Sequence, residues 1–266
     1  MKYYITTFCY GSKYEPVKYK WINRVAEKCK NAEIIIFNDM TILNNTLFKY
    51  EFPGYIWAIR LKHNLDLLSL TKKPIVMCDL DVIIEKNIDP LVHLPFDIII
   101  STEIGGPNAY PKNCSSKLGF GVCCGFMILK KSSLYFIKNI FENMESKKYN
   151  TYDDQVNFMN HIVDSNYTLT EESIILDDKK YTNKIITIGN IKICVLDFHI
   201  ITRDPIINNG QFANHINIDN VGGVFNFLRY FDEILETLPL TCRCGKKHLG
   251  DYNQCIHLKL RNESNL

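Results

Sequence analysis

Short apolar runs and helically spaced apolar positions alternate along the first third of the chain. Residues 2–8, 33–37 and 75–78 are compact apolar runs, which predict buried strands. Between them, residues 14–30 and 55–70 place apolar side chains three or four positions apart, which is typical of one face of a helix. Strands that alternate with helices in this order favour a parallel sheet covered by helices, so the pattern predicts an α/β fold.

The rest of the chain is less regular. Its apolar runs predict further strands at residues 96–101, 122–129, 184–188 and 192–197. Its amphipathic stretches predict helices at residues 133–144, 152–162 and 221–238, and a segment rich in Gly, Pro, Asn and Ser predicts a loop over residues 105–117. We therefore expect one domain over residues 1–238, with a mixed but mostly parallel sheet flanked by helices. A small Cys/His-rich extension over residues 239–266 would follow it.

The composition supports a folded protein and excludes some partners. A chain of 266 residues suits one α/β domain with a small appendage, and 46% hydrophobic residues are enough to build a core. With 31 basic and 29 acidic residues, the formal net charge is +2, which predicts no broad basic field for nucleic acid. We see no apolar stretch long enough to span a bilayer and no signal-peptide core, so we expect a soluble, cytoplasmic protein.

The 10 cysteines are interpreted mainly as reduced, buried thiols, because most of them lie inside apolar runs. The extension differs, since it gathers thiols and an imidazole within a short segment. Cys242, Cys244, His248 and Cys255 could form a tetrahedral structural zinc site, although Cys-x-Cys is a less usual spacing than Cys-x₂-Cys. The alternative is a loosely ordered tail with reduced thiols.

The strongest candidate for chemistry is Asp79-Leu80-Asp81, which directly follows the predicted strand at residues 75–78. In open α/β sheets, ligands bind beyond the carboxyl ends of the strands. An Asp-x-Asp turn in that place can direct two carboxylates at one cation, and such hard oxygen ligands suit Mg²⁺ or Mn²⁺. An ion of this kind takes further ligands from substrate phosphates and can neutralise a leaving diphosphate. The alternative is a solvated acidic turn without a function.

Six short motifs occur in a characteristic order along residues 2–238. They are Thr6-Thr7-Phe8-Cys9-Tyr10, Arg60-Leu61-Lys62, Asp79-Leu80-Asp81, Gly121-Val122-Cys123-Cys124-Gly125, Asp153-Asp154-Gln155, and His215-Ile216-Asn217 with Gly222-Gly223. In this order they resemble the motifs of the nucleotide-diphospho-sugar transferases of GT-A fold. Each motif is weak by itself, and the set is more specific.

The resemblance implies a role for each matching residue. Those expected to contact the nucleotide or its phosphates are Thr7, Tyr10, Arg60 or Lys62, Asp79 and Gly222. Those expected to hold Mn²⁺ or Mg²⁺ are Asp79, Asp81 and His215, with His199 as a rival to the histidine. Asp154 and Gln155 would lie beside the sugar, where Asp154 could orient the donor or the acceptor. The implied reaction moves a sugar from a nucleotide-diphosphate donor, expected to be a UDP-sugar, to a hydroxyl of a glycan, protein or small molecule, with retention of configuration.

The chain departs from the family pattern at two places. Family members often have Asn-Ser where this chain has Cys123-Cys124, so an amide contact to the sugar is not implied here. They also often have a Lys shortly after the glycine of the His-x-Asn segment. Here Phe225-Asn226 occupies that stretch and Arg229 follows a turn later, so basic anchoring of the diphosphate at this end is not implied either.

Other interpretations remain open at this point. Asp153-Asp154-Gln155 could be only a helix start, where acidic side chains favour the helix dipole. Trp57 is interpreted as a core residue and not as a sugar platform. An Asp-x-Asp after an apolar strand also occurs in phosphatases of the haloacid-dehalogenase type, with the first Asp as nucleophile and the second as acid/base. A non-catalytic nucleotide-sugar-binding protein is the third alternative.

Overall fold

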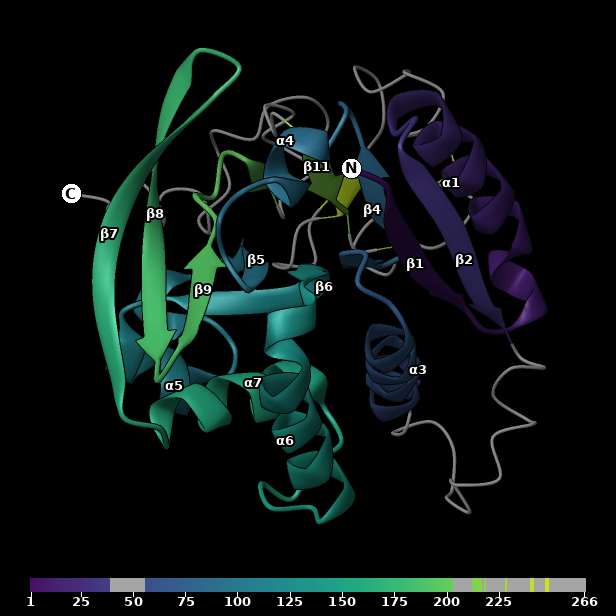
Figure 1. The fold of residues 1–266 in the computed structure, drawn as a ribbon. Helices are drawn as coiled ribbons and strands as arrows, with labels where there is room; N and C mark the ends of the chain where they lie inside the picture. The colour runs from purple at the N-terminus through teal and green to yellow at the C-terminus, as the bar shows by residue number, and fades with distance from the viewer. Residues whose placement is uncertain are drawn as a thin grey trace.

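An eight-stranded sheet forms the centre of the protein (Figure 1). The computed structural model describes residues 1–38, 56–202, 212–216, 218, 228, 240–241 and 247–248. The order of strands across the sheet is β2-β1-β3-β6-β5-β9-β8-β7. The chain thus starts at one side of the sheet, and the two halves of the sequence meet where β3 pairs with β6.

The first half has the alternating order that its apolar pattern predicts. Its elements are β1 (Tyr3–Cys9), the short 3-10 helix η1 (Ser12–Tyr14), α1 (Glu15–Lys28), β2 (Ala32–Asn38), α3 (Ile56–Leu70) and β3 (Ile75–Cys78). Strand β1 lies between β2 and β3 and is parallel to both. All four residues of β3 are buried, as expected of a continuous apolar run in the middle of a sheet.

The second half combines confirmed predictions with corrections. Its elements are β4 (Val82–Ile84), α4 (Asp89–Val92), β5 (Ile98–Glu103), η2 (Gly106–Asn108), α5 (Lys112–Leu118), β6 (Gly121–Leu129), η3 (Lys131–Ser133), α6 (Leu134–Glu145), α7 (Asp154–Val163), β7 (Tyr167–Leu176), β8 (Lys179–Ile188) and β9 (Ile191–Val195). The predicted loop over residues 105–117 was wrong in part, because η2 and most of α5 lie within it. The helix predicted at residues 221–238 lies almost wholly outside the described residues.

Strand β7 was not predicted, because most of its side chains are exposed and it lacks an apolar run. It forms a hairpin with β8 whose two-residue turn is Asp177-Asp178, and both turn residues have positive φ, 48° and 62°. Such left-handed pairs match the right-handed twist of a hairpin, and Asp tolerates the conformation better than most residues. The turn therefore favours the pairing of β7 with β8, which the hydrophobic pattern does not predict.

The α/β class with a mixed sheet is confirmed, but the expectation of a mostly parallel sheet was wrong. Three of its seven neighbouring strand pairs are parallel, and the other four are antiparallel. Strand β6 runs antiparallel to both of its neighbours, β3 and β5. An apolar run predicts that a strand is buried but not which way it runs, so the sequence pattern carried no information on this point.

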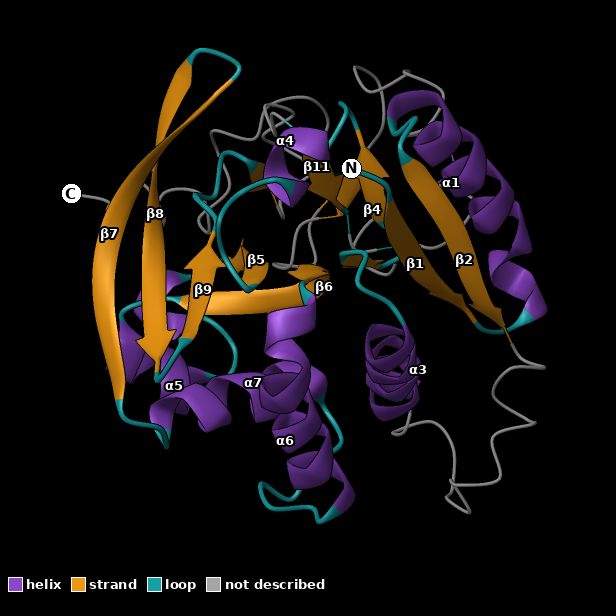
Figure 2. Cartoon of the chain, in the orientation of Figure 1, coloured by secondary structure: helices purple, strands orange, loops and turns teal. Residues whose placement is uncertain are grey.

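Helices cover both faces of the sheet, and each face has its own apolar core (Figure 2). Alternate residues of the strands point to opposite faces, so Val76 packs on one side and its neighbour Met77 on the other. Helices α3, α5, α6 and α7 cover the second of these faces. Helices α1 and α4 lie on the first, together with a small sheet in the order β10-β11-β4, where β10 is Ile201–Thr202 and β11 is Ala213–His215.

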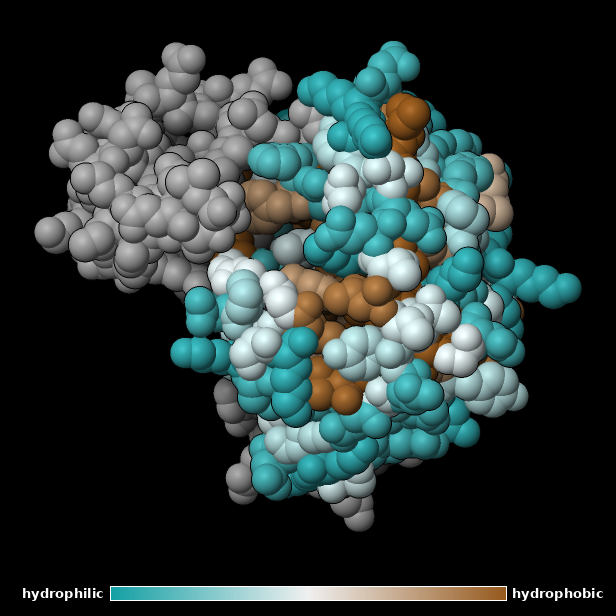
Figure 3. Space-filling view, turned by 90° about the vertical axis from the view of Figure 1, so that its left-hand side faces the viewer, coloured by the Kyte–Doolittle hydropathy of each residue, from teal (hydrophilic) through white to brown (hydrophobic). Residues whose placement is uncertain are grey.

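Figure 3 shows the face of the molecule on which the outer strand β7 lies. Most of this face is hydrophilic where the structure is described, and apolar residues form smaller patches on it. Among the described residues, we find no helix that is both long and apolar enough to cross a membrane. The predicted domain boundary near Pro239 lies outside the described residues. Beyond it, the structure describes only the two-residue strands β12 (Leu240–Thr241) and β13 (Lys247–His248).

Trp21 connects helix α1 to the small sheet. Its side chain is fully buried, and its indole N–H donates a hydrogen bond to the carbonyl oxygen of Val82 at 3.1 Å. We expect Trp21→Phe to lower the free energy of unfolding by about 1–3 kcal/mol, because the Val82 carbonyl loses a buried partner. Urea denaturation followed by circular dichroism would measure this change in the free energy of unfolding. Trp57→Phe, at a site that is 42% exposed, should change it by less than about 0.5 kcal/mol; equal effects would contradict the interpretation.

Candidate active site

The Asp-x-Asp turn is held by three backbone hydrogen bonds, one within the turn and two to other segments. The N–H of Asp79 donates to the carbonyl oxygen of Gly125 on β6 at 2.8 Å. The N–H of Val82 donates back to the carbonyl oxygen of Asp79 at 3.1 Å, which closes the turn between β3 and β4. The N–H of Ile216, directly after β11, donates to the carbonyl oxygen of Asp81 at 2.8 Å. These bonds fix where both aspartate side chains begin.

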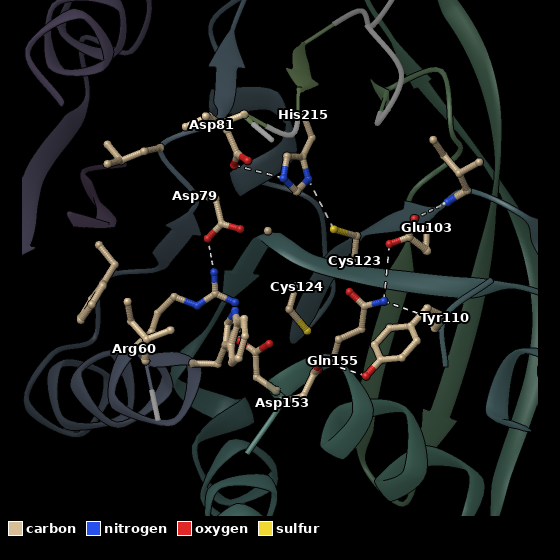
Figure 4. A pocket seen from close by; sticks show the side chains of 18 of the residues that line it. Arg60, Asp79, Asp81, Glu103, Tyr110, Cys123, Cys124, Asp153, Gln155 and His215 are labelled. Atoms are coloured by element: carbon tan, nitrogen blue, oxygen red, sulfur yellow. Dashed lines mark hydrogen bonds and ion pairs between the residues drawn. The ribbon is translucent and has the colours of Figure 1, made fainter. Parts of the chain in front are cut away.

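His215 reaches the aspartates because β11 pairs with β4. The pairing is antiparallel and places His215 opposite Val82, one residue after Asp81. The Nε2 atom of His215 lies 3.1 Å from a carboxylate oxygen of Asp81, and its Nδ1 atom lies 3.4 Å from the thiol sulfur of Cys123 (Figure 4). Residues more than 130 positions apart in sequence thereby form one cluster.

Asp79, Asp81 and His215 could hold a divalent cation. One ligand atom from each lies within 4.8 Å of the others, and the three offer the oxygen and nitrogen donors that suit Mn²⁺ or Mg²⁺. Burial disfavours charge on His215, but the Asp81 carboxylate overcomes it and raises the pKa of the imidazole to about 10. Burial raises the pKa of Asp79, and Asp81 adds to this while Arg60 opposes it. Asp81 thus favours the charged imidazole of His215, whereas burial and Asp81 disfavour a charged Asp79 and Arg60 offsets this only in part.

Gly125 lies directly against His215 and Asp79, and no larger residue fits at its position. A Cβ atom at this position would lie 2.3 Å from Cε1 of His215 and 2.9 Å from a carboxylate oxygen of Asp79. Neither contact is possible without displacing one of the two side chains. The glycine of Cys123-Cys124-Gly125 is thus required by the close approach of β6 to the cluster.

Arg60 connects the cluster to a second group of acidic residues. Its guanidinium forms ion pairs with Asp79 on one side and Asp154 on the other, and the side chains of Arg60 and Asp154 are buried. Burial alone would disfavour the charge, but Asp154 and Asp79 hold the pKa of the guanidinium well above its ordinary value. Lys62 does not reach the site, because its ammonium pairs with Asp66 one turn along α3, at 2.5 Å.

A second group of side chains lines the cavity next to Arg60 and includes its partner Asp154 (Figure 4). We call it the acidic wall, and it consists of Glu103, Tyr110, Asp153, Asp154 and Gln155. Gln155 joins its members, because its amide donates to the Tyr110 carbonyl oxygen at 2.8 Å and to Glu103 at 3.4 Å. Asp153 caps α7 by accepting from the N–H of Val156 at 2.9 Å, and burial raises the pKa of its carboxyl.

These groups share one cavity of about 650 Å³. Its lining includes the candidate metal ligands Asp79, Asp81 and His215, which we call the metal-ligand cluster, together with Arg60 and the acidic wall. Four aromatic residues from β1, the segment after it and the start of α3 also line the cavity, and we call them the aromatic wall: Phe8, Tyr10, Tyr14 and Trp57. Ile56 lies beside Trp57 in the lining. The cavity opens beyond the carboxyl ends of β1 and β3, which is where ligands bind in open α/β sheets.

The structure brings together most of the residues that the sequence analysis selected. The lining includes Tyr10, Arg60, Asp79, Asp81, Asp154, Gln155 and His215. Thr7 is buried and does not line the cavity, and His199 is exposed and lies outside the cluster with Asp79. Gly222 and the candidate zinc ligands Cys242, Cys244 and Cys255 lie outside the described residues, and His248 lies in β13.

Some lining residues were missed or misinterpreted. The interpretation of Trp57 as a core residue was wrong, since it is 42% exposed and lines the cavity. Glu103 was not selected, although it stands at the carboxyl end of a predicted strand, which was a usable signal. Tyr110 sits in the segment predicted as a loop, and nothing in its sequence context marks it.

The fold matches a known structure over most of its length. A glycosyltransferase involved in the glycosylation of the major capsid of PBCV-1 superposes with a TM-score of 0.53 at 12% sequence identity, over 88% of this chain and 100% of that chain. The fold is that of a glycosyltransferase. Mouse xyloside xylosyltransferase 1 in its apo form gives a TM-score of 0.49 at 12% identity, over 82% of this chain and 99% of that chain. No protein-family model matches this chain, and no curated protein matches it.

The Arg60 bridge makes a prediction for stability. Arg60→Gln leaves the buried Asp154 carboxylate without its cation, so we expect the free energy of unfolding to fall by about 3–5 kcal/mol. Lys62→Gln removes only an exposed pair on the same helix and should cost less than about 1 kcal/mol. Urea denaturation in EDTA would measure both variants. Equal effects would contradict a special role for the bridge.

The close contact of Gly125 with the cluster makes a prediction for metal binding. Gly125→Ala should weaken Mn²⁺ binding by about 10–100-fold in calorimetric titration, because the new methyl group displaces His215 or Asp79. Gly121→Ala is a matched control on the same strand, since its Cβ would meet Ala109 at 2.5 Å and not the ligand cluster. We expect the control to lose stability but keep its Mn²⁺ affinity. Equal Mn²⁺ affinity in the two variants would show that Gly125 does not shape the site.

Proposed function

We propose that the protein is a divalent-cation-dependent glycosyltransferase that moves a sugar from a nucleotide-diphosphate donor to a hydroxyl acceptor. One observation carries the proposal: Asp79, Asp81 and His215 converge at the carboxyl end of β3, inside a cavity of a glycosyltransferase fold. Two carboxylates and an imidazole are a suitable set for Mn²⁺ or Mg²⁺, and the cavity has room for a nucleotide-sugar.

The charge of the cavity supports a need for the cation. Its lining contains five carboxylates, against one arginine and one histidine, among the side chains that the structure describes. Arg60 already pairs with two of these carboxylates, Asp79 and Asp154. A diphosphate is itself anionic, so it would meet like charges here unless a cation stands between. When bound, a divalent cation supplies that charge and stabilises the leaving diphosphate.

The protein side chains would then divide the remaining work. In this proposal the aromatic wall, including Tyr10, packs against the base of the nucleotide, because flat aromatic rings suit such a surface. Arg60 holds Asp79 and Asp154 in fixed positions on the two sides of β6. Asp154 and Gln155 lie beside the donor sugar, where a carboxylate and an amide can bind hydroxyl groups. Thr7 and Gly222 remain predictions from the family resemblance, and Lys62 is assigned no contact.

The finer features of the reaction also rest on the resemblance. We propose a UDP-sugar as donor, Mn²⁺ as the preferred ion and retention of the anomeric configuration. Incubation with a panel of UDP- and GDP-sugars, with Mn²⁺ or EDTA, would identify the donor from the nucleotide diphosphate released. Proton NMR of the fresh product would read the anomeric configuration. Phosphate release from phosphomonoesters, without nucleotide release, would instead favour the phosphatase alternative. Tight nucleotide-sugar binding without turnover in the presence of acceptors would favour a binding protein.

A conservative substitution tests the metal site directly. We expect Asp81→Asn to lower the rate of Mn²⁺-dependent nucleotide release at least about a hundredfold, because the cation loses a charged ligand. Asp66→Asn is the matched control, since this exposed carboxylate on α3 pairs with Lys62 away from the cavity. A rate for Asp81→Asn as high as that of the control would overturn the assignment of Asp81.

A further inference from the structure

Strand β6 is irregular where it passes the metal-ligand cluster. Cys124 and Met127 pack in the same apolar core, although residues three positions apart point to opposite faces of a regular strand. The pairing with β5 shows the cause. Ile100 lies opposite Met127, but the next residue, Ser101, lies opposite Cys123, so β6 has extra residues between the two pairs. Such bulges occur next to active sites, where they change the direction in which a side chain points.

The irregularity leaves Cys123 beside His215 (Figure 4). Cys123 is buried, and its thiol sulfur lies 3.4 Å from Nδ1 of the imidazole. Its carbonyl oxygen accepts a hydrogen bond from the hydroxyl of Ser101 at 2.9 Å, which ties this part of β6 to β5. The backbone of the sheet therefore holds the thiol in place, independently of the histidine.

The two ring nitrogens of His215 have different neighbours. Nε2 lies 3.1 Å from a carboxylate oxygen of Asp81, whereas Nδ1 faces the sulfur of Cys123. A cation that Asp81 and His215 share would take the lone pair of Nε2, because this nitrogen is on the carboxylate side. The ring proton is then on Nδ1, where the sulfur can accept it in a weak hydrogen bond. Metal-bound histidines commonly donate this second N–H to a partner that fixes the orientation of the ring.

Resting on the proposed function, we propose that Cys123 is a positioning residue for the divalent cation: its sulfur accepts a hydrogen bond from Nδ1–H of His215 and so holds Nε2 toward Asp79 and Asp81. Cys123 acts through His215 and not as a ligand. The neighbouring thiol of Cys124 does not share this role, since it packs in the apolar core that includes Met127. Without the sulfur, the imidazole can turn away from the aspartates, and the cation is bound less tightly.

Substitutions at Cys123 test this inference through the affinity for Mn²⁺ alone, measured by calorimetric titration. Cys123→Val keeps a buried apolar side chain but offers no acceptor, so we expect the affinity to fall about 10–100-fold. Cys123→Ser provides an acceptor again and should recover most of the affinity. Cys123→Ala also lacks the acceptor and gives a second route if Cys123→Val does not fold. Cys194→Val is the matched control, since this buried thiol on β9 does not line the cavity, and it should keep the wild-type affinity.

A double-mutant cycle separates positioning of the histidine from a general disturbance of the site. In His215→Ala the ring is absent, so the further change Cys123→Val should alter the Mn²⁺ affinity by less than about twofold. A loss as large as in the wild-type background would overturn the inference, because Cys123 would then not act through His215. Wild-type affinity in Cys123→Val, or equal losses in Cys123→Ser and Cys123→Val, would overturn it as well. Absence of Mn²⁺ binding in the wild type would instead count against the metal site of the proposed function.

Discussion

The site depends on the buried guanidinium of Arg60. Two acidic groups on opposite sides of β6 come close to the same cavity, and each would be costly to bury alone. Arg60 pairs with both of them, with Asp79 next to the metal-ligand cluster and with Asp154 at the start of α7. The bridge therefore holds one carboxylate at the candidate cation site and one at the place proposed for the sugar. It also ties α3 to α7 across the face of the sheet.

The backbone makes this arrangement precise. Strand β6 supplies the carbonyl oxygen that holds Asp79, and its Gly125 lets His215 and Asp79 approach. The Cys123 thiol lies 3.4 Å from Nδ1 of His215, so it contacts the histidine ring at the place where members of the resembling family often have Asn-Ser. A departure that counted against a sugar contact thus has a structural explanation. The same cavity concentrates negative charge, which fits the divalent cation that the proposed reaction needs.

Much of the architecture was readable from the sequence, because local pattern determines it. The buried run Ile75–Cys78 and the helical spacing of α1 and α3 are produced by residues close together in the chain. Asp79 and Asp81 were selectable because the end of such a strand is where ligands bind. His215 and Arg60 were selected only through the resemblance of motif order to a known family, and either of two basic residues on α3 was compatible with it.

Tertiary structure decided what depends on contacts between distant segments. The choice between Arg60 and Lys62 followed from the direction in which α3 presents each side chain, because one faces Asp79 and the other faces Asp66. The antiparallel pairing of β5 with β6 brought Glu103 into the cavity that Asp79 and Asp81 also line, where it contacts Gln155 of α7, and no local pattern could express this. Sequence by itself determined which segments are buried and which carry acidic groups. Only the pairing of strands in space decided which acidic groups share one cavity. The apolar pattern of a segment predicts whether that segment is buried, but the distance between two segments depends on the whole fold.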